Sequence, residues 1–275
     1  PENELKFRVD FVYSEENSEK DADKYWEKEG RRLNGRIEDF VGKRKAMEQA
    51  VATIISPNDA PEAKLQKIYA RAQQMRNLSF EVSKTEQELK REKRKEINNV
   101  EDVWKRGYAD GGEITWLFLG LARAAGFEAF PVLVSRRNEY FFNRAIMNPH
   151  QLNDNVVLVK LNGKDVYFDP GTVHTPFGLL PWPDTAAVGL RLDKNGGSWV
   201  QTSLPAGADS RIERRAVLKL NPDTGGLEGK LTVTFAGLEA LSTRIEEHRE
   251  DDVNRKRFLE DQIKEYIPAG IEIEL

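Results

Sequence analysis

The sequence predicts an α+β protein in which a buried central helix packs on an antiparallel β-sheet. Residues 111–125 are apolar on nearly every side, which is typical of a helix enclosed by its own domain. Short apolar segments at 129–134, 156–161 and 166–169 follow this helix and predict three strands, the last two joined by a turn at Asn162-Gly163. A helix followed by consecutive antiparallel strands is typical of α+β domains.

The N-terminal part predicts one strand and two helices. Residues 4–13, ELKFRVDFVY, alternate in polarity and predict a strand of a preceding β domain, to which residues 1–17 are assigned. From Ser18 to Ile55, apolar residues recur at helical spacing and leave a charged opposite face. Two prolines, Pro57 and Pro61, interrupt this pattern, and a second helix is expected from Glu62 to about Asn77.

Residues 84–97, KTEQELKREKRKEI, form a run of mixed charge. One interpretation is an electrostatic docking segment. Because both signs are interspersed, the sequence favours a solvated helix or an exposed loop instead.

The central helix has recognisable ends in the sequence. Asp110 and Glu113 are spaced as a capping-box pair, which starts the helix at Gly111 or Gly112. Gly126 is the expected stop, because glycine adopts the left-handed conformation that ends helices.

The character of the sequence changes after about Pro205. Segments 212–220 and 231–235 alternate as strands around the turn sequence NPDTGG. A long charged helix is expected from about Leu238 to Tyr266, followed by a short strand, IEIEL, at 271–275. The sequence therefore predicts a main domain at 18–205 and a partial C-terminal β-β-α-β domain at 206–275.

Composition excludes several classes of function. The chain has 42 basic and 46 acidic residues, and its net charge of −4 disfavours a general nucleic-acid or membrane-surface role. No apolar run approaches the ~18–20 residues of a transmembrane helix. Because there is no cysteine, disulfides, thiolate metal sites and thiol nucleophiles are excluded. The three histidines are His150, His174 and His248, and neither a metal nor a cofactor is expected.

The segment ADGGEITWLFLGLARAAGFEAFPVLV resembles the core of the bacterial transglutaminase-like superfamily, whose fold is related to papain-like cysteine proteases. In that family a Gly-Asp-Cys turn begins a helix that ends in Ala-Ala-Gly. A histidine stands at the head of a later strand and an aspartate at the end of the next, often before proline. The corresponding segments here are LNDNVVLV and VYFDPGT, and the resemblance covers about residues 60–200.

The family geometry has a physical basis. A cysteine at a helix N-terminus has its thiolate stabilised by the helix dipole, a histidine on a neighbouring strand takes the proton, and an aspartate orients the imidazole. By this resemblance the cysteine position is Gly111, the histidine position is Asp154, and Asp169 alone matches. Glycine has no nucleophile, so the resemblance implies a pseudoenzyme.

The resemblance also implies a cleft around the start of the central helix. There the helix N-terminus would leave free N–H groups that favour an anion. The expected cleft residues are Arg106, Tyr108, Asp110, Gly112, Trp116, His150 and Asn153. The alternative for Tyr108 and Trp116 is ordinary core and rim packing.

Three functions remain open at this stage. The first is an inactive transglutaminase-like domain that binds an extended peptide or protein, or acts as a scaffold, within a larger, exported bacterial protein. The second is a hydrolase or amidase of another class that uses the Asp154 and Asp169 carboxylates or a metal. The third is a structural spacer. The resemblance favours a periplasmic or extracytoplasmic location, with the cytoplasm as the alternative. No nucleic-acid partner and no membrane insertion of this fragment are expected.

Overall fold

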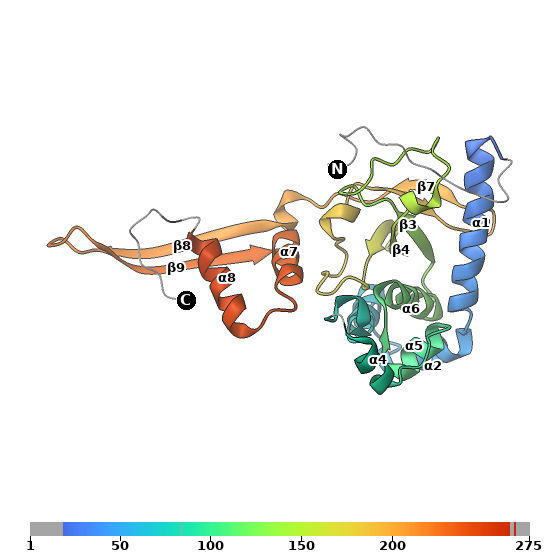
Figure 1. Ribbon diagram of the computed structural model, residues 1–275, viewed down its shortest axis with the longest axis horizontal. Helices are drawn as coiled ribbons and strands as arrows, with labels where there is room; N and C mark the ends of the chain where they lie inside the picture. Colours follow the sequence, from blue (N-terminus) through green and yellow to red (C-terminus); the bar gives the residue numbers. More distant parts are fainter. Residues whose placement is uncertain (1–18, 83, 265–266, 268–275) are drawn as a thin grey trace. The chain divides into compact units, whose positions relative to one another are not determined.

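A computed structural model describes residues 19–82, 84–264 and 267 (Figure 1). The chain divides into two compact units between residues 204 and 205. The predicted strands at 4–13 and 271–275 lie outside the described residues, as does the β domain assigned to 1–17.

The first unit has six helices and seven strands among its described residues. The helices are α1 (Ala22–Val41), α2 (Arg44–Ile54), α3 (Pro61–Gln73), α4 (Glu86–Glu92), α5 (Val100–Arg106) and α6 (Gly111–Ala124). The strands are β1 (Arg76–Asn77), β2 (Tyr108–Ala109), β3 (Ala129–Val134), β4 (Asp154–Leu161), β5 (Lys164–Phe168), β6 (Val188–Arg191) and β7 (Ser198–Gln201).

The predicted single helix from Ser18 to Ile55 is wrong in one respect, because it is two helices. Helix α1 ends at Gly42, whose N–H donates to the Asp39 carbonyl, and α2 begins two residues later. The break lets both helices contact α6, which one straight helix of this length could not do. The buried side chains have the helical spacing that the sequence shows, as at Trp26, Ile37 and Met47.

Helix α6 is the centre of the unit. It contacts α1, α2, α3 and α5 and strands β3 and β4. In Figure 1, α6 lies between β3 and β4 on one side and α2 and α5 on the other. Eight of its residues are buried, including Leu117, Phe118 and Leu119. The predicted fold class, a buried central helix on an antiparallel sheet, is therefore confirmed.

The sheet has the strand order β5-β4-β3-β6-β7 with antiparallel neighbours throughout. Because successive side chains point to opposite faces, both faces of β4 carry buried residues. Val157 and Val159 belong to the main core beside α6, whereas Val156 and Leu158 belong to a second cluster on the other face. A sheet covered on both faces reads in the sequence as a continuous apolar run.

Four strands were not predicted from the sequence. Strands β6 and β7 have four residues each and include polar or glycine positions, so they show no extended alternation. Strands β1 and β2 pair for only two residues each, joining Arg76 to Tyr108 and Asn77 to Ala109. Such short elements depend on tertiary contacts rather than on a local pattern.

The second unit contains β8 (Arg211–Leu220), β9 (Leu227–Ala236), α7 (Leu238–Glu246) and α8 (Asp252–Lys264). The predicted hairpin around NPDTGG is confirmed. The predicted continuous helix from Leu238 to Tyr266 is wrong, because α7 ends at Glu246. Asp251 then starts a new helix by accepting a hydrogen bond from the Asn254 N–H at 2.8 Å.

The charged segment at 84–97 contains the short helix α4 followed by a loop. Within the described part of the chain, no helix has the length and apolar content needed to cross a bilayer.

Candidate functional site

The start of α6 has the predicted capping box. The Glu113 N–H donates to Asp110 Oδ1 at 2.8 Å, and the Asp110 N–H donates to Glu113 Oε2 at 3.0 Å. The Gly111 N–H donates to Ser79 Oγ at 3.0 Å. The expected row of free N–H groups is therefore wrong for two of the first three helical residues, because Asp110 and Ser79 already accept from them.

Gly111, at which the resemblance predicts the cysteine position, packs against the loop after β5. A Cβ atom added at Gly111 would lie 2.8 Å from the Gly171 carbonyl oxygen. A Cβ atom at Gly171 would lie 2.2 Å from the Gly111 carbonyl oxygen and 2.4 Å from Thr115 Oγ1. The two backbones approach so closely that a side chain at either position requires them to separate.

The loop after β5 is held in place by hydrogen bonds from α3 and from β1. Tyr69 Oη donates to the carbonyl oxygens of Asp169 and Thr175, at 3.0 and 2.9 Å. Asn77 Nδ2 donates to the Gly171 carbonyl oxygen at 2.7 Å. The close contact between Gly111 and Gly171 is thus fixed from several sides.

Asp154 and Asp169 come from different strands and converge beside α6. Asp154 is the first residue of β4, opposite Val134 of β3, and Asp169 follows the last residue of β5. A Cβ atom at Gly112 would lie 3.0 Å from the side-chain amide nitrogen of Asn155, which places the head of β4 next to the helix start. The three positions of the resemblance therefore share one place in the fold.

Two further charged residues belong to this place and were missed in the sequence. Arg136 follows β3, and its Nε lies 3.5 Å from Asp154 Oδ2 and 3.9 Å from Asp184 Oδ1. Asp184 lies in a short 3₁₀ turn at Trp182–Asp184 and is fully buried. No periodic pattern in the sequence marks either residue. Asp184 does stand among apolar residues and prolines, and this setting is a weak signal that an aspartate is buried.

The three aspartates form an acidic cluster, by which we mean Asp154, Asp169 and Asp184. Burial, together with the charges of Asp154 and Asp169, raises the pKa of Asp184 to about 8. Burial also raises the pKa of Asp169 to about 7, together with the charge of Asp154. The pKa of Asp154 is raised mainly by burial, against the effect of Arg136. Like charges at close range cannot all ionise, so the cluster retains protons at neutral pH.

Several oxygens of the acidic cluster have no hydrogen-bond partner within the described part of the chain. They are Asp169 Oδ2 and both carboxylate oxygens of Asp184. A carboxyl group with a pKa near 7 can act as a general acid or base, because its pKa lies close to the working pH. Access is restricted, however: Asp169 is 2% exposed and Asp184 is 0% exposed.

No metal site is evident here. Among the described residues, no group of three or more histidine, aspartate or glutamate side chains has the arrangement that a metal ion requires. The Arg136 guanidinium instead supplies the positive charge between Asp154 and Asp184.

The expected cleft residues make contacts within the chain. Arg106 donates to the Glu96 carbonyl oxygen and pairs with Asp102 at 3.2 Å. The Tyr108 hydroxyl accepts from the Lys95 N–H at 2.9 Å and donates to the Lys95 carbonyl at 3.0 Å. These residues therefore brace the segment after α4.

The remaining expected cleft residues have the following contacts. Trp116 packs against the main core. Asn153 accepts from the Arg136 N–H at 2.9 Å and donates to Glu139 at 2.8 Å. His150 is exposed in a 3₁₀ turn, and its backbone N–H donates to Asn148. In the described residues, no hydrogen bond or ion pair joins the His150 side chain to the acidic cluster.

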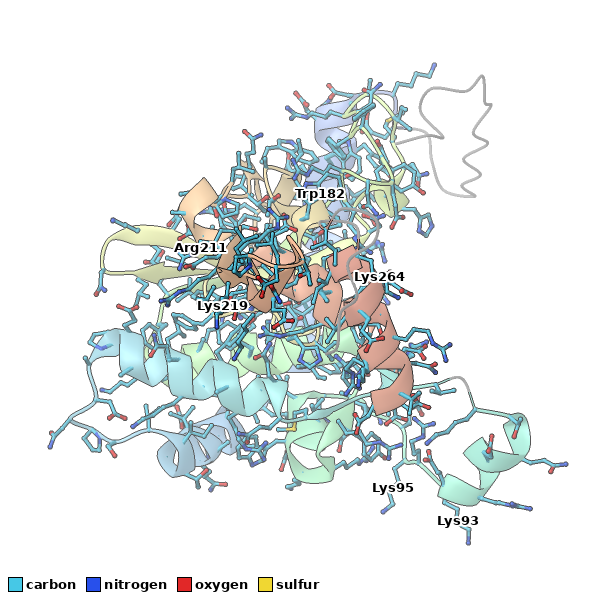
Figure 2. The ribbon with its side chains drawn as sticks, turned by 90° about the vertical axis from the view of Figure 1, so that its left-hand side faces the viewer. Lys93, Lys95, Trp182, Arg211, Lys219 and Lys264 are labelled. Atoms are coloured by element: carbon cyan, nitrogen blue, oxygen red, sulfur yellow. The ribbon has the colours of Figure 1, made fainter. Side chains whose placement is uncertain are left out.

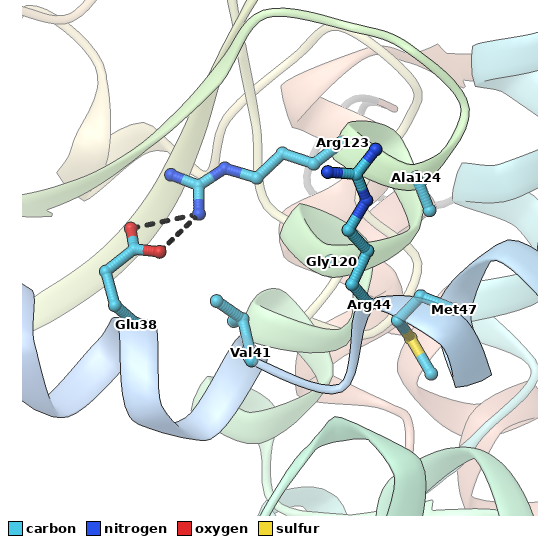
Figure 3. Close-up of a pocket in the computed structure, with 8 residues that line it drawn as sticks. Glu38, Val41, Arg44, Met47, Gly120, Arg123 and Ala124 are labelled. Atoms are coloured by element: carbon cyan, nitrogen blue, oxygen red, sulfur yellow. Dashed lines mark hydrogen bonds and ion pairs between the residues drawn. The ribbon is translucent and has the colours of Figure 1, made fainter.

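A pocket of about 330 Å³ lies near the other end of α6 (Figure 3). Its lining includes Glu38, Arg44, Met47 and Arg123. Arg123 Nη1 contacts both Glu38 carboxylate oxygens, at 2.9 and 3.0 Å, and its Nε donates to the Ala129 carbonyl. Because this arginine is already paired with Glu38, the pocket offers little uncompensated charge to a ligand.

No protein-family profile matches the chain, and no curated protein sequence matches it. Among solved structures, it is similar to the crystal structure of a putative protease from Parabacteroides distasonis, with a TM-score of 0.46 and 10% sequence identity. The similarity covers 82% of this chain and 57% of the other chain, so this chain spans just over half of that protein's length.

Proposed function

We propose that residues 18–205 form a transglutaminase-like domain that has lost catalysis and serves as a scaffolding or protein-binding module of a larger exported bacterial protein. The observation that carries the proposal is the convergence of Gly111, Asp154 and the Asp169 loop, with the nucleophile position closed by Gly171. The site keeps the arrangement of elements that the resemblance implies, but it has no room for a nucleophile. This combination favours a domain that has kept the fold and lost the reaction.

The contacts of the cleft residues favour the scaffolding side of this proposal over an open peptide cleft. Arg106, Tyr108 and Asn153 are each held by hydrogen bonds within the chain. An extended peptide would have to replace those contacts before it could bind. The module therefore contributes a fixed framework at this position.

The second candidate is an enzyme of another class that uses Asp154 and Asp169 as acid and base. The unpartnered oxygens and raised pKa values of the acidic cluster favour it. Only Asp154 is partly accessible, with 28% of its side chain exposed, and Arg136 lies beside it. Because Asp169 is buried, a substrate would have to enter the acidic cluster at Asp154 before it could contact Asp169.

Thiol labelling tests the closure at Gly111 directly, because the chain has no cysteine of its own. Gly111→Cys and the matched control Gly35→Cys are treated with a maleimide dye under native conditions. A Cβ at Gly35 meets nothing within 4 Å, so its thiol should react rapidly. The Gly111 variant should react at least tenfold more slowly or show a clearly lowered melting temperature. Rapid labelling of an unperturbed Gly111→Cys protein would contradict the closure.

An activity assay separates the two candidates. The wild-type chain and Asp154→Asn are incubated with a mixed peptide library, and products are followed by mass spectrometry. We expect identical, background product patterns from both proteins. Cleavage or amide exchange by the wild type that Asp154→Asn abolishes would establish the enzymatic alternative instead.

A further inference from the structure

One face of the hairpin of β8 and β9 is apolar except for Arg214, and the other face is polar except for Val217 and Ala236. Directly opposed residues of an antiparallel pair share a face. Ile212 is opposite Phe235, and further along the hairpin Leu220 is opposite Leu227, so these pairs lie on the apolar face. Helix α7 contacts both strands, and its Ala240 and Leu241 are buried.

The far half of the apolar face is uncovered within the described residues. Leu218, Leu220 and Leu227 are 56%, 60% and 60% exposed. In the described part of the chain, this sheet consists of β8 and β9 alone. A two-stranded sheet is only marginally stable by itself, and a third strand or a packed layer normally supplements it.

The polar face is basic along β8. Arg211, Arg215 and Lys219 point to this face, at every fourth position (Figure 2 labels Arg211 and Lys219). Arg211 lies 4.0 Å from Glu213, whereas Arg215 and Lys219 form no ion pair with any described residue. The polar face of β9 carries one acid and one base, Glu228 and Lys230. On the polar face, the β8 edge therefore carries a net positive charge, whereas the charges along the β9 edge cancel.

We propose that β8 is a docking edge for an extended segment of another protein in which apolar and acidic residues alternate. The segment would add as a third strand through main-chain hydrogen bonds. Its apolar side chains would extend the face of Leu218 and Leu220. Its acidic side chains would lie next to Arg215 and Lys219 on the opposite face. This inference goes beyond the proposed function and does not depend on it.

Other occupants fit the hairpin less well. A second copy joined through β8 would place its basic side chains against those of the first, and like charges across strands are destabilising. The chain's own residues 271–275, IEIEL, have the right pattern, and the test below distinguishes them from a partner segment.

The test measures fluorescence anisotropy of a labelled nine-residue peptide of alternating Ile and Glu, titrated with the whole chain. The matched peptide has the same composition in blocks, five Ile and then four Glu. We expect saturable binding of the alternating peptide, at least tenfold tighter than the block peptide. The double variant Arg215→Glu, Lys219→Glu should weaken binding at least tenfold. The control Lys28→Glu, Lys45→Glu makes the same charge change at exposed helix positions and should leave binding unchanged.

Four outcomes of the titration overturn the proposal. They are the absence of binding, equal binding of the two peptides, equal weakening by the control variant, and binding that appears only in a variant lacking residues 271–275. The last outcome would identify the chain's own segment as the occupant. Sedimentation equilibrium and co-flotation with anionic phosphatidylserine vesicles complete the test. A dimer that the double variant disrupts, or vesicle binding that it abolishes, would replace the partner strand by a second copy or a membrane.

Discussion

The two antiparallel sheets of this protein are built from similar pairings but differ in what covers them. Strand β4 has an uninterrupted buried stretch from Val156 to Val159, with α6 on one face and a second apolar cluster on the other. Strand β8 is exposed at nine of its ten residues. Strand β4 is paired with β5, and strand β8 is paired with β9 along its whole length. Strand pairing alone therefore does not produce a hydrophobic core.

The difference teaches that a strand gains stability from its layers. Burial of apolar surface contributes roughly 25 cal/mol per Å², whereas exchanging water for a partner strand contributes little per hydrogen bond. The first sheet has both faces covered and no solvent-exposed apolar run. The second has apolar side chains available for a further contact, which is the physical basis of the docking edge.

The sharpest test of this comparison uses one leucine from each sheet. Leu158→Ala in β4 removes a side chain that is 1% exposed and should cost ~2–5 kcal/mol of unfolding free energy. Leu218→Ala in β8 should cost less than about 0.5 kcal/mol. Urea unfolding followed by far-ultraviolet circular dichroism measures both variants, because the helices and strands of both units contribute to the signal. Similar losses for both variants would break the comparison.

Burial also has an electrostatic consequence in the first unit. The raised pKa of Asp184 means that the folded protein holds a proton which the unfolded chain releases above pH ~4. The contribution of Asp184 to the unfolding free energy therefore falls as pH rises from about 4 to about 8.

Asp184→Asn should weaken this dependence. Relative to wild type, the variant should gain up to ~4 kcal/mol between pH 4.5 and pH 8.5, because it has no carboxyl to ionise. Melting temperatures across this pH range measure the effect. Asp165→Asn, at an exposed position of β5, is the control and should leave the profile unchanged. Parallel profiles for wild type and Asp184→Asn would contradict the assignment.

The loop after β5 packs tightly against the start of α6 at Gly171. Gly171→Ala places a Cβ against the Gly111 carbonyl and Thr115, and should cost ~1–3 kcal/mol or more. Gly35→Ala, in the middle of α1 with open space around its Cβ, should stabilise the protein by ~0.5–1 kcal/mol. Urea midpoints compare the two. A neutral Gly171→Ala would show that the contact with α6 is loose.

The smallest expected effect concerns the start of α6. Asp110→Ala removes the side chain that accepts from the Glu113 N–H and should cost ~1 kcal/mol. Thr85→Ala removes the corresponding residue of α4, which is short and solvated, and should leave the urea midpoint almost unchanged. Equal losses would show that the caps contribute independently of what their helices bury.

Much of the fold is readable in the sequence because some elements carry their own signals. Asp110, Glu113 and the apolar residues between Gly111 and Ala124 predict α6 with both ends, since capping and all-round burial are local patterns. The apolar runs of β3, β4 and β5 predict these strands for the same reason. Strands β6 and β7 were missed because four residues are too few to establish a period.

The site was only partly predictable. Gly111, Asp154 and Asp169 were found through the family resemblance, but Arg136 and Asp184 were not. These two carry no pattern that a single sequence shows, and they join the acidic cluster only because β3 and the 182–184 turn end beside β4. Likewise, Ser79 reaches the Gly111 N–H from 32 residues away, which removed the expected free helix terminus.

The sequence by itself determined the absence of cysteine chemistry, the buried central helix and its caps, and the alternation that divides the hairpin into two faces. These depend on residue identity and on spacings of a few residues. Only the tertiary structure decided that Gly171 packs against Gly111, that Arg136 lies between Asp154 and Asp184, and which leucines stay exposed. Those outcomes depend on distances between segments that are far apart along the chain, and local patterns carry no information about such distances.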